Sequence, residues 1–142
     1  MEYRYEQYAA YIQENPEYYL DKFSKMDISG KKNSWNWAAF FFTDAWMLYR
    51  KMYKWFLITI IGQWIVAAII PSLFIVVRVL VALFGNYLYK EHIDKLSTDG
   101  ALLPADQQEA HRKKHGGTST KAICAYCIIS FILAIYFIIL GI

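Results

Sequence analysis

The last 21 residues carry no charged side chain, and this feature constrains the fold more than any other. Residues 122–142 read AICAYCIISFILAIYFIILGI. As an α-helix this stretch would be about 31 Å long, which matches the ~30 Å hydrocarbon core of a bilayer. Lys121 and the cluster Arg112-Lys113-Lys114 precede it. Because basic residues flanking a span stay on the cytoplasmic side, we expect this span to start inside the cell and the C-terminus to lie outside.

A second apolar stretch, residues 55–89, is too long for a single crossing. One continuous helix would extend about 52 Å. Its only charge is Arg78, and Pro71-Ser72 lie near its middle. Basic residues flank both ends, and a helical hairpin of residues 55–70 and 72–89 keeps both ends cytoplasmic. A single kinked crossing would place one basic cluster outside, so the pattern favours the hairpin.

Three further segments are more polar. Residues 1–34 carry six acidic and five basic residues, with apolar residues at helical spacing, which predicts an amphipathic cytoplasmic or interfacial arm. Asn15 is the expected N-cap of its second helix and Pro16 the first helical residue. Residues 35–54 predict one interfacial or re-entrant helix with a narrow polar stripe. Residues 90–120 predict a cytoplasmic segment with a short helix from Pro104 to His115.

The expected fold class is therefore an all-α integral membrane bundle. Residues 1–34 form its amphipathic N-terminal arm, and residues 35–142 form the membrane domain. Three membrane helices place the N-terminus inside; if residues 35–54 also cross, there are four and it lies outside. The composition fits, since 57% of residues are hydrophobic and 18% aromatic, and membrane–water interfaces accommodate Trp and Tyr.

One long motif supports a family resemblance. Residues 35–53, WNWAAFFFTDAWMLYRKMY, resemble the signature of a bacterial membrane family known as domain of unknown function 2628. Gly85-Asn86 with Tyr89, and then Gly116-Gly117-Thr118-Ser119, follow in the family's order. The resemblance spans roughly residues 19–119. It implies a small multi-pass protein of the bacterial inner membrane and implies no activity.

Eight positions stand out as candidate functional or structural polar sites: Asn36, Asp44, Arg50, Lys51, Arg78, Asn86, Gly116 and Gly117. Asp44 and Arg78 are the charges set most deeply in apolar sequence. An arginine at mid-membrane costs several kcal/mol unless it is paired or hydrated. We expect Arg78 to bond to Asp44, to Gln63 or to helix carbonyls, or to reach water; the functional alternative is a polar path or an anion site.

The remaining motifs favour simple explanations. Arg50, Lys51 and Lys54 are expected to anchor a span or to contact anionic lipid headgroups. Cys124 and Cys127 follow no strand, so packing between helices explains them better than redox chemistry. The pair of histidines in residues 111–115 encloses three cations, which oppose a divalent metal. We therefore expect no catalytic residue, cofactor or metal.

The sequence predicts a function in binding rather than in chemistry. We expect a non-enzymatic interaction or assembly protein, or an accessory subunit of a larger membrane complex. The alternative is a small channel or transporter subunit with a polar path around Arg78. The expected partners are anionic membrane lipids and either further copies of the chain, as an oligomer, or other membrane protein subunits; nucleic acid is not expected.

Overall fold

A computed structural model describes residues 2–70 and 73–141, and within these ranges it is all-helical with no strand. The all-α fold class is thereby confirmed. The helices are α1 (Glu2–Ile12), α2 (Pro16–Ser29), α3 (Trp37–Phe41), α4 (Thr43–Tyr49), α5 (Tyr53–Ile69), α6 (Phe74–Ala101), α7 (Ala105–His115) and α8 (Thr120–Leu140).

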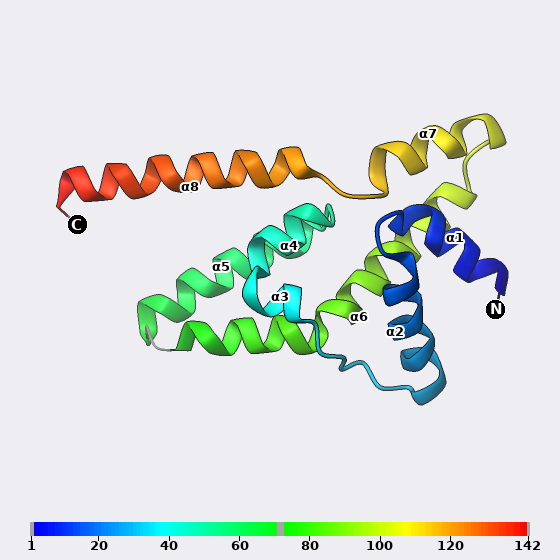
Figure 1. Ribbon diagram of the computed structural model, residues 1–142, viewed down its shortest axis with the longest axis horizontal. Coiled ribbons are helices and arrows are strands. Elements are labelled where there is room, and N and C mark those ends of the chain that lie inside the picture. The colour runs from blue at the N-terminus through cyan, green and yellow to red at the C-terminus, as the bar shows by residue number, and fades with distance from the viewer. Residues whose placement is uncertain (1, 71–72, 142) are drawn as a thin grey trace.

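The long helix α6 joins two groups of helices (Figure 1). One group is a polar end and the other an apolar end, because exposed large apolar side chains are concentrated on α5, the first half of α6 and α8. At the polar end α1, α2 and α7 surround the second half of α6. At the apolar end α5 and the first half of α6 run antiparallel, and α8 extends in the same direction as α5. The buried core lies where the two ends meet, and aromatic residues dominate it: Tyr8, Tyr19, Phe23, Trp46 and Tyr89.

The N-terminal arm is a helical pair that packs on α6. Helix α2 begins at Pro16, as predicted, because proline presets the helical φ angle at the first position. Asn15 occupies the N-cap position, but it adopts the left-handed conformation and its side chain makes no capping hydrogen bond. Gly30, with φ of 70°, ends the helix, and its N–H donates to the Met26 carbonyl.

The prediction of one helix over residues 35–54 was wrong. The chain forms two short helices, α3 and α4, which meet at Phe42, and α4 ends before a turn in which Lys51 has a φ of 57°. A local side chain explains the first break, because the Thr43 hydroxyl donates to the Ala39 carbonyl, 2.8 Å away. Asn36 caps the start of α3. The predicted continuous polar stripe therefore does not exist.

Helix α6 is longer than predicted. It continues through residue 89, where the sequence suggested the start of a polar segment, and ends at Ala101. Ile93 and Leu96 continue its apolar face after Tyr89 and pack on the core, so the charged residues between them do not end the helix. Helix α7 lies within the expected range of 104–115, and α8 matches the expected last span to within two residues at either end. The expected turn at Pro71-Ser72 lies outside the described residues.

One helix in the described part of the chain is long and apolar enough to cross a membrane. The apolar window belongs to α8, and none of it is buried. Helix α5 is equally apolar in character but has 17 residues. Length and composition thus support membrane association through α8.

Candidate functional site

Asn36 and Asn86 form a buried amide pair between the start of α3 and the middle of α6. Asn36 is 2% exposed and Asn86 is fully buried. The Asn36 Nδ2 donates to the Asn86 Oδ1 at 2.8 Å, and the Asn36 Oδ1 accepts from the Ala39 N–H at 3.0 Å. The Asn86 Nδ2 donates to the carbonyl and hydroxyl of Ser34. The pair satisfies its own polar groups and fixes residues 34–36 on α6.

The main chain strengthens the same contact. The Ser34 N–H donates to the Leu83 carbonyl and the Asn36 N–H to the Ala82 carbonyl. Gly85 allows α6 to lie close to Trp46 of α4, because a Cβ at this position would lie 3.3 Å from the Trp46 ring. The first two motifs of the family resemblance therefore contact each other directly.

Arg50 faces the interior of the protein. It is 4% exposed, and its Nη1 donates to the Glu14 carbonyl at 3.0 Å. Its guanidinium carbon lies 4.5, 5.5 and 5.4 Å from the ring centres of Tyr19, Tyr49 and Tyr89. Such contacts with aromatic faces stabilise a desolvated cation. Of the two roles expected of Arg50, span anchor and headgroup contact, its burial does not fit headgroup contact, because Arg50 joins α2, α4 and α6.

Lys51 is also bound internally. Its Nζ donates to the Gly116 carbonyl at 2.6 Å and to the Lys114 carbonyl at 3.2 Å. Burial lowers the pKa of this amine. Gly116 leaves no room for a side chain, because a Cβ would lie 2.8 Å from the carbonyl oxygens of Arg112 and Tyr11.

Gly117 follows with a φ of 69°, a left-handed conformation that suits glycine, and its N–H donates to the Tyr11 carbonyl at 2.7 Å. The Ser119 N–H then donates to the Tyr49 carbonyl at 2.8 Å. The third motif is therefore bonded to the end of the first.

Six of the eight candidate positions thus lie at one junction, where the polar end meets the apolar helices: Asn36, Arg50, Lys51, Asn86, Gly116 and Gly117. Their contacts are within the chain, and they hold α1, α4, α6 and α7 together. The geometry assigns them a structural role in fixing the directions in which α5 and α8 leave the junction.

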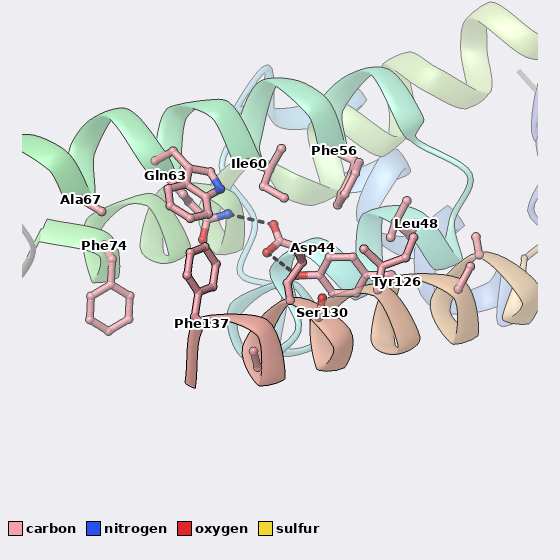
Figure 2. Close-up of a pocket in the computed structure, with 16 residues that line it drawn as sticks. Asp44, Leu48, Phe56, Ile60, Gln63, Ala67, Phe74, Tyr126, Ser130 and Phe137 are labelled. Carbon is pink, nitrogen blue, oxygen red and sulfur yellow. Dashed lines mark hydrogen bonds between the residues drawn. The ribbon is translucent and has the colours of Figure 1, made fainter. Parts of the chain in front are cut away.

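Asp44 lies apart from this junction, half-buried between α5 and α8. Its Oδ1 accepts from the Gln63 Nε2 at 2.8 Å and its Oδ2 accepts from the Tyr126 hydroxyl at 3.3 Å. Figure 2 shows both side chains pointing at the carboxylate. Neither donor carries a charge, and no ion pair involves Asp44 in residues 2–70 and 73–141.

The Asp44 carboxylate opens into a groove of about 790 Å³ between α5 and α8, with α4 at one end. The two walls come from Phe56, Ile60, Trp64 and Ala67 of α5 and from Ala125, Ile129, Leu133 and Phe137 of α8. Apolar side chains form most of the surface, and Asp44, Gln63, Tyr126 and Ser130 supply its polar groups. The groove has the character of a binding site for an apolar ligand with one polar feature.

Arg78 takes one of the bonds expected for it. Its Nη1 donates to the Phe41 carbonyl at 3.2 Å, and its guanidinium lies 5.9 Å from the ring centre of Phe74. Its Nε is buried and has no hydrogen-bond partner among the described residues. No bond joins Arg78 to Asp44 or Gln63 there, and Arg78 does not line the groove.

Sequence reasoning missed Tyr126 and Ser130. Their spacing of four residues places both on one face of α8, but that helix is apolar all round and offers no signal for which face is turned inward. Cys124 and Cys127 are both exposed free thiols. Among residues 2–70 and 73–141 no group of His, Cys, Asp and Glu is arranged to hold a metal ion.

Comparison with models of known protein families, with curated proteins and with solved structures found no match to this chain.

Proposed function

We propose that the protein is a non-enzymatic assembly subunit of a bacterial inner-membrane complex, and that it holds a transmembrane helix of a partner protein between α5 and α8. The observation that carries this proposal is the Asp44 carboxylate, which lies in an apolar groove and whose hydrogen-bond donors among the described residues are all neutral.

The energetics of a carboxylate at this position favour a cationic partner. A charge in apolar surroundings is costly unless an opposite charge or several hydrogen bonds compensate it. Asp44 has two such bonds, of 2.8 and 3.3 Å, and one of them is long. A lysine or arginine on a helix lying in the groove would complete its neutralisation and would select that helix among other apolar ones.

The surroundings of the groove also favour a membrane partner. Large apolar side chains cover the outer surfaces of α5, the first half of α6 and α8, including Leu57, Ile61, Ile65, Val76, Ile132 and Ile139. We propose that these helices make three crossings with the polar end in the cytoplasm and the C-terminus outside. In this placement Lys54 and Lys121 mark the start of α5 and α8 at the inner surface. We also propose membership of the family that residues 35–53 resemble.

Substitution of Asp44 tests the proposal. Wild type, Asp44→Asn and Asp44→Glu are purified from bacterial membranes in mild detergent, and Asp21→Asn on the exposed surface of α2 is the matched control. Loss of a charge-assisted bond worth about 1.5–3 kcal/mol predicts at least about a tenfold loss of co-purified partner for Asp44→Asn. Asp44→Glu and Asp21→Asn are expected to retain it. Equal recovery with Asp44→Asn would contradict the proposal.

A small channel or transporter subunit is the second candidate, because Asp44, Gln63 and Tyr126 gather three polar groups among apolar walls. A path around Arg78, as first expected, has less support, since Arg78 bonds to the Phe41 carbonyl outside the groove lining. Ion flux into liposomes tests this candidate. Flux that changes with Asp44→Asn while partner recovery stays constant would replace the assembly role with transport.

A further inference from the structure

A polar cleft of about 680 Å³ lies at the junction, between the start of α5, the second half of α6 and the end of α7. All three histidines of the chain line it: His92, His111 and His115. Four lysines line it as well: Lys51, Lys54, Lys95 and Lys114. This cleft is separate from the groove, and the proposed assembly role does not use it.

Four lysines and three carboxylates line the cleft, so positive charge exceeds negative charge there. Asp94 accepts a hydrogen bond from the Tyr8 hydroxyl of α1. Burial and the charge of Asp99 raise the pKa of Tyr11 on the same helix, against the opposing charge of Arg112. The ion pairs in the described part of the chain include none between a cleft lysine and a cleft carboxylate. Glu91 is the remaining acid at the cleft.

The histidines experience this excess of positive charge. The Nε2 of His92 is buried without a hydrogen-bond partner among the described residues. Burial, Lys95 and His115 together lower the pKa of His92. Burial, His111 and Lys114 act in the same direction on His115. An anion in the cleft would reduce this repulsion.

The position of the cleft indicates which anion is available. Tyr53, Lys54 and Trp55 line it at the point where α5 begins, and the Lys54 ammonium lies 5.7 Å from the ring centre of Trp55. Tryptophan and lysine at the start of an apolar helix are typical of the membrane–water interface. In the proposed membrane placement the cleft is level with the phosphates of the inner leaflet.

We propose that this cleft binds the phosphate group of an anionic phospholipid, with Lys54 and Lys95 as its contacts and with Glu91 limiting its affinity. The inference rests on the proposed membrane placement and not on the groove or its partner. Arg50 and Lys51, which were expected to contact lipid, are instead bonded within the chain. In this proposal Lys54 and Lys95 make the lipid contact.

Lipid binding by purified protein tests the inference. Native mass spectrometry in mild detergent measures the affinity for phosphatidylglycerol and, as a reference, for phosphatidylcholine of the same chain length. Each lysine near a lipid surface contributes about fivefold, so Lys54→Gln/Lys95→Gln is expected to bind phosphatidylglycerol about 30-fold more weakly. Glu91→Gln is expected to bind it several-fold more tightly. The matched control Lys22→Gln/Lys113→Gln removes the same charge outside the cleft and should bind as wild type.

Two results would overturn the inference. One is equal weakening in the cleft variant and the control variant, with helix content unchanged by circular dichroism, because the effect would then reflect net charge. The other is equal competition by soluble glycerol 3-phosphate, which would assign the cleft to a free phosphate. Asp44→Asn is expected to bind lipid as wild type, so failure of this inference and failure of the assembly role give separate results.

Discussion

The buried pair Asn36 and Asn86 offers the sharpest test of how the junction is held together. Replacing Asn36 with alanine removes the cap of α3, which costs about 0.5–2 kcal/mol. It also leaves the Asn86 Oδ1 buried without its 2.8 Å partner, at a further cost of about 1–3 kcal/mol. Together these changes lower the free energy of unfolding by about 1.5–5 kcal/mol.

Replacing Asn86 with alanine has a similar expected cost for a different reason. It leaves the Asn36 Nδ2 unpartnered and removes two bonds to Ser34, of 3.3 and 3.2 Å. The double variant has neither orphaned amide, so it lacks the part of each single variant's penalty that arises from the partner left behind. We therefore expect the double variant to be more stable than the sum of the singles predicts, by about 1–3 kcal/mol.

Urea unfolding in a mild detergent, followed by near-ultraviolet circular dichroism, measures all four proteins of this cycle. Asn33→Ala, an exposed neighbour, is the matched control and should change the free energy of unfolding by less than about 0.5 kcal/mol. Additivity of the two single changes to within about 0.5 kcal/mol would refute the direct bond between the amides.

Three other substitutions test the junction and the polar end by the same unfolding assay, and a fourth, Gly62→Ala in α5, is a control. Arg50→Lys should destabilise the protein by about 1–3 kcal/mol, because an ammonium cannot keep both the carbonyl bond and the three ring contacts; an unchanged stability would contradict the ring contacts. Gly116→Ala should cost about 1–3 kcal/mol through its clash with two carbonyls, whereas Gly62→Ala, with no neighbour within 4 Å, should be neutral or stabilising by up to about 1 kcal/mol. Burial opposes the ionisation of Asp27, but Lys90 and two other donors outweigh it and lower its pKa. The stability that the Asp27 carboxylate contributes is present above about pH 4 and is lost at lower pH. Asp27→Asn should therefore reduce the fall in the free energy of unfolding between about pH 5 and 3. The same pH dependence in wild type and variant would contradict the ion pair.

The helices with long, regular patterns could be predicted from the sequence. Residues 120–140 are apolar enough to exclude other structures, and the three- and four-residue spacing of Tyr19, Phe23 and Met26 predicted the buried face of α2. Pro104 and the two glycines after His115 predicted where α7 begins and ends, because proline favours a helix start and glycine a helix end. These features depend on neighbours in the chain, which the sequence displays directly.

Apart from the break between α3 and α4, where the Thr43 hydroxyl bonds to the Ala39 carbonyl, the errors came from interactions between distant residues. Residues 35–54 have a helical pattern throughout, but hydrogen bonds to α6, 46 or more residues later, hold Asn36 and Ser34 in place and fix the start of α3. Arg50 has the sequence context of an anchoring cation, and three tyrosines from separate helices turn it inward. The partners of Asp44 lie 19 and 82 residues away, which no local pattern specifies.

Site-specific photocrosslinking along α8 tests the central claim that the groove holds a partner's membrane helix. A photoreactive residue is placed at Ile129 or Leu133, which line the groove, or at the neighbouring Ile128 or Ile132, which are exposed but do not line it. We predict that the first pair crosslinks in membranes to one partner helix carrying a lysine or arginine, that Asp44→Asn abolishes this product, and that the second pair does not form it. Equal crosslinking from all four positions, insensitivity to Asp44→Asn, or a product that maps only to α6 of a second copy would contradict the proposed function.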